Sequence, residues 1–202
     1  MRGLTCVLAT LCLLAAPPAL AGKEEKTIGV DSIDIYYTAN VIMPTCTVVI
    51  EGPQIIDNGG DKYTLTLGNA QGETTLNAIK SGLAKSDFKL ILRDDARQQC
   101  SSNLNDVGIT LTTPNTLNSA GELVLNRITD SSGAANIAVG FYLRDDASKT
   151  WLKFNTQPDT FRYSLTEISN GVWLTAQLAE TAANQGGKGK FAAQVVFNFD
   201  YR

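Results

Sequence analysis

Apolar and polar residues alternate along most of this chain, and the alternation is clearest at its C-terminal end. Counting back from the end, one face of an extended chain would carry Tyr201, Phe199, Phe197, Val195, Ala193 and Phe191. The residues between them, such as Asp200 and Asn198, are mostly polar. Successive side chains of a β-strand point to opposite faces. The pattern therefore predicts a half-buried strand that continues to the last residues.

The same alternation recurs in short segments along the chain. Strands are expected in residues 41–43 and 47–50 and in the segments YTLTLG, FKLILRD, VGITLTT, IAVGFYLRD, WLKF, FRYSLTEI and VWLTAQL. Turn sequences such as DNGGD, NAQGE and TDSSG separate them. The only helix predicted is a short one within residues 75–83. Many short strands at this spacing predict an all-β sandwich.

Residues 1–21 have the features of a secretory signal peptide. They contain one positive charge at Arg2, an apolar run over residues 4–16, and the small-residue sequence Ala19-Leu20-Ala21 before the expected cleavage point. A membrane anchor is the alternative, but the run is shorter than the roughly 20 residues that a spanning helix needs. We therefore expect residues 1–21 to be removed on export.

Charge and side-chain chemistry narrow the classes of function. The net charge is −3, and loss of Arg2 with the signal peptide makes it −4, which does not suit a nucleic-acid partner. The chain contains no histidine, so histidine-based catalysis is unavailable. We expect no enzymatic activity, no cofactor and no metal site.

Two cysteines, Cys46 and Cys100, follow the signal peptide. Paired thiols persist as disulfides in the oxidising compartments to which exported proteins go. Metal binding is the competing interpretation, but two cysteines without histidine make a poor zinc site. A disulfide between Cys46 and Cys100 is therefore predicted.

Several motifs of the chain belong together: VIMPTCTV around Cys46, FKLILRDDARQQC ending at Cys100, AVGFYLRD, and a C-terminal strand with a penultimate tyrosine, Tyr201, and a glycine fourteenth from the end, Gly189. Together they resemble the pilin subunits of the chaperone–usher pathway of Gram-negative bacteria. This resemblance implies an incomplete immunoglobulin-like sandwich that lacks its seventh strand and is completed by donor-strand complementation.

The resemblance also implies partners and a location. A periplasmic chaperone would first cover the open edge beside the C-terminal strand, and at the outer-membrane usher the N-terminal extension of a neighbouring pilus subunit would replace it. The protein would thus pass through the periplasm to a cell-surface fimbrium and contribute to adhesion. The implied assembly strand consists of Gly189, Phe191, Ala193, Val195, Phe197, Phe199, Tyr201 and Arg202, with the terminal carboxylate of Arg202 bound by the chaperone.

By the same resemblance, residues 22–41 would be the donor extension and residues 42–202 the pilin domain. The donor face would consist of Ile33, Ile35, Tyr37, Ala39 and Val41. A second register, centred on Gly29 between Ile28 and Val30, stays open. So does the interpretation that this stretch is an ordinary first strand of the domain itself.

Two other functions remain as alternatives. One is a tip adhesin or glycan-binding fimbrial protein, with Trp151, Trp173 or Tyr142 contacting a host glycan or surface receptor. The other is a secreted binding protein with a complete β-sandwich. Compared with a typical major pilin the chain is somewhat long, and the extra residues are expected within 112–136 and 180–188. This length favours a minor subunit.

Overall fold

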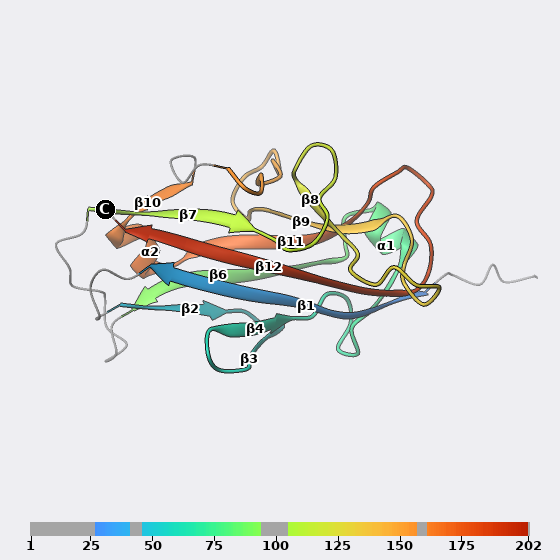
Figure 1. Ribbon diagram of the computed structural model, residues 1–202, viewed down its shortest axis with the longest axis horizontal. Coiled ribbons are helices and arrows are strands. Elements are labelled where there is room, and N and C mark those ends of the chain that lie inside the picture. Colours follow the sequence, from blue (N-terminus) through green and yellow to red (C-terminus); the bar gives the residue numbers. More distant parts are fainter. Residues whose placement is uncertain (1–26, 41–45, 94–104, 157–160, 202) are drawn as a thin grey trace, which may run out of the picture.

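A computed structural model describes residues 27–40, 46–93, 105–156 and 161–201, which fold into two packed β-sheets (Figure 1). The strands are β1 (Thr27–Asn40), β2 (Thr47–Glu51), β3 (Ile55–Asp57), β4 (Lys62–Leu65), β5 (Glu73–Thr75), β6 (Lys85–Arg93), β7 (Asp106–Thr112), β8 (Leu123–Leu125), β9 (Ile137–Leu143), β10 (Arg162–Ser164), β11 (Val172–Glu180) and β12 (Lys190–Tyr201). The all-β sandwich expected from the alternating pattern is confirmed.

The two sheets differ in how their strands are ordered. Sheet A has seven strands in the order β10-β7-β12-β1-β4-β3, with β5 also paired to β1. Sheet B has five strands in the order β2-β6-β11-β9-β8. The N-terminal strand β1 therefore lies in the interior of sheet A, and it separates β12 from β4.

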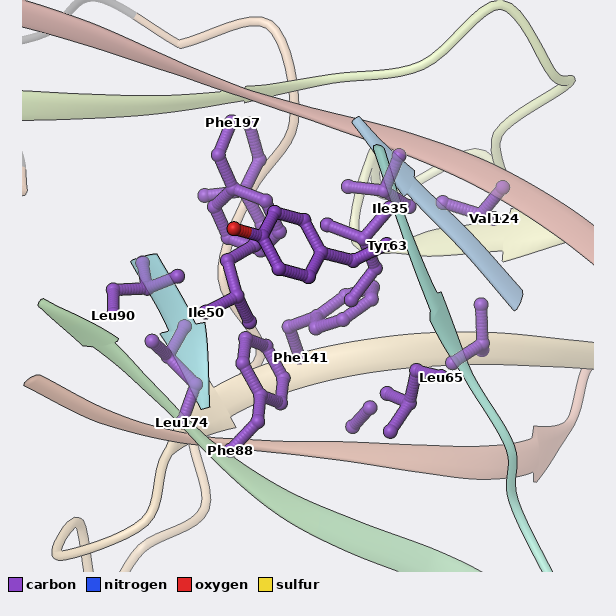
Figure 2. Close-up of a cluster of buried hydrophobic side chains, with 14 of the residues drawn as sticks. Ile35, Ile50, Tyr63, Leu65, Phe88, Leu90, Val124, Phe141, Leu174 and Phe197 are labelled. Atoms are coloured by element: carbon purple, nitrogen blue, oxygen red, sulfur yellow. The ribbon is translucent and has the colours of Figure 1, made fainter. Parts of the chain in front are cut away.

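Three phenylalanines join the sheets at the centre of the core. Phe88 of β6 and Phe141 of β9 come from sheet B, and Phe197 of β12 comes from sheet A (Figure 2). The ring centroids are 6.0–6.1 Å apart, and every pair has an edge-to-face arrangement, which aromatic rings prefer to face-to-face stacking. The inward row predicted for the C-terminal strand is thus a structural part of the core.

The helix expected within residues 75–83 is confirmed as α1 (Leu76–Lys80), which begins where the side chain of Thr75 accepts a hydrogen bond from the backbone N–H of Ala78. The strand expected for FRYSLTEI is wrong over its second half. That half forms a second helix, α2 (Leu165–Asn170). Among the described residues, no helix has the length and apolar character needed to span a membrane.

The helix α2 forms because a capping box outweighs the alternation of apolar residues. The side-chain oxygen of Ser164 accepts from the backbone N–H of Glu167, and the Glu167 carboxylate accepts from the backbone N–H of Ser164. The strand expected for WLKF is also wrong, because only Phe154 of that segment pairs, in an isolated bridge to Leu111.

Candidate functional site

The candidate site is the place in sheet A where β1 lies between β12 and β4. β1 runs parallel to β12 from the pair Gly29–Lys190 to the pair Asn40–Asp200, and antiparallel to β4. Its first residues also pair with β5. We call the space that β1 fills between β12 and β4 the β12–β4 groove.

Most of the predicted donor residues lie in this ladder. Ile33 pairs with Ala193, and the following matched pairs are Ile35–Val195, Tyr37–Phe197 and Ala39–Phe199. Val41 lies outside the described residues. The ladder also has a bulge between Val30 and Ser32, where one extra residue is inserted into the strand. The bulge places the segment around Gly29 in the same ladder, opposite the start of β12.

Ile35 is the described side chain of β1 that lies deepest in the core. It is fully buried, and it shares a cluster with Tyr63 and Leu65 of β4 (Figure 2). Its backbone is matched to Val195 on one side and to Tyr63 on the other. Full burial of an isoleucine side chain contributes about 1.5–3 kcal/mol. The fold therefore needs an apolar side chain at this point of the groove.

The opposite edge of β12 is bonded to loops of the same domain over its first residues. Asn126 donates through Nδ2 to the carbonyl oxygen of Lys190 at 2.8 Å, and its Oδ1 accepts from the backbone N–H of Ala192 at 3.0 Å. The side-chain amide thus takes the place of a peptide group in a neighbouring strand. Backbone bonds from Arg127 to Ala192 and from Ala134 to Lys190 complete this edge.

The same edge continues through a second pair of loop side chains. Asn115 Oδ1 accepts from the backbone N–H of Gln194 at 3.1 Å, and Thr113 Oγ1 donates to the Gln194 carbonyl oxygen at 2.6 Å. From Val196 onward, β7 pairs with this edge. From the sequence, extra residues and turns were expected within 112–136, and no sequence signal marks Asn115 or Asn126 as hydrogen-bond partners of the β12 backbone.

The two edges of β12 therefore have different hydrogen-bond partners: loops and β7 on one edge, and β1 on the other. Lys190, Ala192 and Gln194 direct their backbone groups to the loops, so the odd-numbered residues direct theirs to the other edge, where β1 lies. Buried backbone groups without partners are costly. Removing β1 would leave that edge of β12 without a strand and expose the core around Ile35.

Gly189, at the start of the predicted assembly strand, has a steric reason to be glycine. A Cβ atom there would lie 2.5 Å from the backbone nitrogen of Ala134 and 2.5 Å from the carbonyl carbon of Gly133. Its φ of +150° is also rarely adopted by other residues. The glycine lets the loop approach closely enough for Ala134 to bond to Lys190.

An ion-pair cluster lies near the C-terminal end of β12. Arg162 of β10 bonds to Asp106 of β7, and its second guanidinium nitrogen is 3.6 Å from Asp200 of β12. The arginine side chain is only 19% exposed. These contacts join three neighbouring strands of sheet A. Arg202, the last predicted residue of the assembly strand, lies outside the described residues.

Tyr201 fills the core at the same end. Its hydroxyl has no hydrogen-bond partner among the described residues. Burial raises the pKa of this hydroxyl to about 12, because the charged phenolate would lose its hydration. The penultimate tyrosine thus acts in this fold as an apolar group.

Cys46, immediately before β2, is bonded in a disulfide. Cys100, its predicted partner, lies outside the described residues, so this pairing stays a prediction. No group of three or more His, Cys, Asp or Glu side chains gathers in the described part of the chain in a way that could hold a metal ion.

The three aromatic residues considered for glycan contact lie on or near sheet B, and each has a packing role. Tyr142 is only 2% exposed, and the Trp151 ring lies 5.5 Å from it in an edge-to-face arrangement. A Cβ on Gly140 would meet the Trp151 ring at 2.5 Å, so this ring lies directly over the glycine. Arg144 and Lys89 lie over Trp173 at 4.2 Å and 5.5 Å from its ring centroid.

These features define an all-β protein of the two-sheet sandwich class, in which an N-terminal strand makes one sheet continuous. A family model described as "Fimbrial protein" matches residues 35–202. The chain belongs to this family of fimbrial proteins.

Two further similarities accompany the family match. The chain is 32% identical over 173 residues to the "Uncharacterized fimbrial-like protein YadM" of Escherichia coli (strain K12), and the alignment covers 84% of this chain and 87% of that protein. The crystal structure of the P pilus rod subunit PapA aligns with 79% of this chain and 100% of its own, at 16% identity and a TM-score of 0.47.

Proposed function

We propose that this protein is a structural, non-catalytic pilus subunit that polymerises by donor-strand exchange. The strand that carries Ile33, Ile35, Tyr37 and Ala39 in one subunit would fill the β12–β4 groove of another. Membership of the fimbrial family supports the role of subunit. We call the edge of β12 that faces β4 its inner edge. The observation that carries the mechanism is that β1 alone, among the described strands, pairs with this inner edge.

The position of β1 in the chain makes such an exchange physically simple. β1 precedes every other described element, and the five residues 41–45 connect it to the part of the chain that continues into β2. It can therefore be withdrawn without threading past another strand. Exchanging an identical terminal element between copies is a low-cost route to association, because every contact that is lost within one subunit is regained between two.

An empty β12–β4 groove would be an exposed strand edge beside an apolar trough, which is an aggregation hazard. This hazard supports a role for a periplasmic chaperone that covers the groove and for an outer-membrane usher at which subunits are joined. We further propose that the subunit reaches a cell-surface fimbrium through the periplasm. There it contributes to adhesion, as a minor component rather than the main rod subunit.

Polymer growth provides the test, with Ile35→Asp as the key variant. A carboxylate side chain at this position cannot enter the apolar groove of a neighbour, but the groove of the variant subunit keeps its own lining. The variant should therefore accept a strand without donating one. Mixed with wild-type subunits, it should shorten the polymers seen by electron microscopy and size-exclusion chromatography.

The matched control is Ile56→Asp, because Ile56 lies on the edge strand β3 and is 57% exposed. This variant should enter polymers of normal length. Polymers of wild-type length in mixtures with the Ile35→Asp subunit would contradict strand exchange through β1.

A further inference from the structure

We propose that the subunit closes its own β12–β4 groove and that this closed monomer is an autoinhibited state. The inference rests on the proposed function, since it concerns the groove through which subunits would be joined. One groove holds one strand. A subunit whose own β1 occupies the groove therefore cannot accept the strand of another subunit until β1 leaves.

The intramolecular ladder is long enough to compete with an incoming strand. Its matched pairs run from Gly29 to Asn40 along β12, and four further pairs join β1 to β4. Ile35 is fully buried within it. On the outer face of sheet A, the carboxylate of Asp34 lies 3.9 Å from the guanidinium of Arg127, in the loop that bonds to the other edge of β12. The closed state thus uses apolar burial, backbone pairing and one weak ion pair.

The short connection to β2 determines the direction in which β1 can enter its own groove. The end of β1, the end of β12 and the start of β2 lie at the same end of the sandwich (Figure 1). Six residue steps separate Asn40 from Cys46, and they span at most about 21 Å. An antiparallel β1 would place Asn40 near Lys190, at the far end of a ladder about 33 Å long. Only the observed parallel direction can be reached.

Closure by β1 protects the monomer as well as inhibiting it. The inner edge of β12 and the core around Ile35 are covered without a second protein, so a closed subunit presents no open groove to other chains. The same closure slows exchange, because the withdrawal of β1 must precede or accompany the entry of another strand. Assembly should then be controlled by the opening of the monomer.

A reversible cross-link between β1 and β12 tests this state in the full mature chain. Asp34 and Gln194 are matched in the ladder and partly exposed. Neighbouring strands are about 4.8 Å apart, within the range of Cα separations that a disulfide bridges. Oxidation of an Asp34→Cys, Gln194→Cys monomer should give an intramolecular bridge, mapped by mass spectrometry. The bridged monomer should fail to take up a labelled peptide of residues 27–40, and reduction should restore uptake.

The control pairs Asp34→Cys with Asn198→Cys, which lies four residues further along β12 and is matched to Thr38. This pair should form no bridge within the monomer.

The absence of a bridge in the first variant, or equal peptide uptake by its bridged and reduced forms, would overturn self-closure. If the reduced form takes up peptide although no bridge forms, the proposed strand exchange stands and self-closure alone fails. If the reduced form takes up no peptide, the proposed strand exchange fails as well.

Discussion

The side-chain amide of Asn126 donates to the carbonyl oxygen of Lys190, with 2.8 Å between Nδ2 and that oxygen. It thus takes the place that a peptide group of a neighbouring strand would have. Asn126→Ala should remove this bond and the bond that Oδ1 accepts from Ala192. The carbonyl oxygen of Lys190 would keep its bond from the backbone N–H of Ala134, but the N–H of the buried Ala192 would lose its partner, at a cost of about 1–3 kcal/mol. Urea denaturation would measure the free energy of unfolding. The control Asn58→Ala removes an exposed bond to Thr64 and should cost less than about 0.5 kcal/mol.

Shortening Ile35 should weaken the hold of β1 on its groove. Ile35→Ala would leave a cavity in the core and should lower the free energy of unfolding by about 2–5 kcal/mol. Ile56→Ala, at an exposed position of the same residue type, should change it by less than about 0.5 kcal/mol. Equal effects of the two substitutions would mean that β1 does not contribute to the folded core in solution.

Two tyrosines should make the protein sensitive to high pH. The pKa of Tyr201 is raised to about 12 by burial, and that of Tyr163 to about 12 by burial and by the charge of Glu167. Between about pH 10 and pH 12 the unfolded chain would lose these protons while the folded protein keeps them. The free energy of unfolding should therefore fall as the pH rises through this window.

The substitution Tyr201→Phe separates this effect from general alkaline damage. At neutral pH it should change stability little, because the hydroxyl has no hydrogen-bond partner among the described residues. Above pH 10 the variant should lose less stability than the wild type. Parallel pH profiles for the two proteins, measured by urea denaturation, would argue against a buried, neutral Tyr201.

The start of α2 offers a test of local stability. Ser164→Ala should remove the hydroxyl that accepts from Glu167 and cost about 1 kcal/mol, within the usual range of 0.5–2 kcal/mol for a helix cap. Ser164→Thr keeps a capping oxygen and should recover most of the loss. Thermal unfolding followed by circular dichroism would compare the three proteins, and equal midpoints for Ala and Thr would exclude a contribution from the cap.

Gly189→Ala should disturb the start of β12. The added Cβ would meet the backbone of Gly133 and Ala134 at 2.5 Å, and relief of such an overlap typically costs about 1–3 kcal/mol. In contrast, a Cβ on Gly29 would meet no atom within 4 Å, so Gly29→Ala should be nearly neutral. Urea denaturation of both variants checks the difference.

Alternation predicted the strands well where one face of the strand is buried. In β12, Phe191, Val195 and Phe197 are fully buried while Gln194 is partly exposed, so the pattern follows directly from the pleat. α2 was missed because Phe161, Tyr163 and Leu165 also alternate. The better signal was the spacing of Ser164 and Glu167, which a capping box requires.

The arrangement around β1 could be predicted only in part. The alternation from Ile33 to Ala39 predicted a strand, but the direction and partners of a strand depend on contacts far away in the chain. The two registers proposed for the segment share one ladder here, because the bulge between Val30 and Ser32 offsets the strand by one residue. The bonds from Asn115 and Asn126 to β12 arise from tertiary packing, which no local pattern encodes.

The unequal edges of β12 have a consequence for the shape of any fibre built from this subunit. Asn126, Asn115 and β7 already occupy one edge of β12, so β12 would have a single edge at which to receive a strand, and β1 would be the strand to give. Head-to-tail contacts of this kind build open filaments when the rotation from one subunit to the next does not lead back to the first subunit, and closed rings when it does. Such a filament would not branch at β12. Its two ends would also differ chemically, one ending in an unused strand and the other in an unfilled groove.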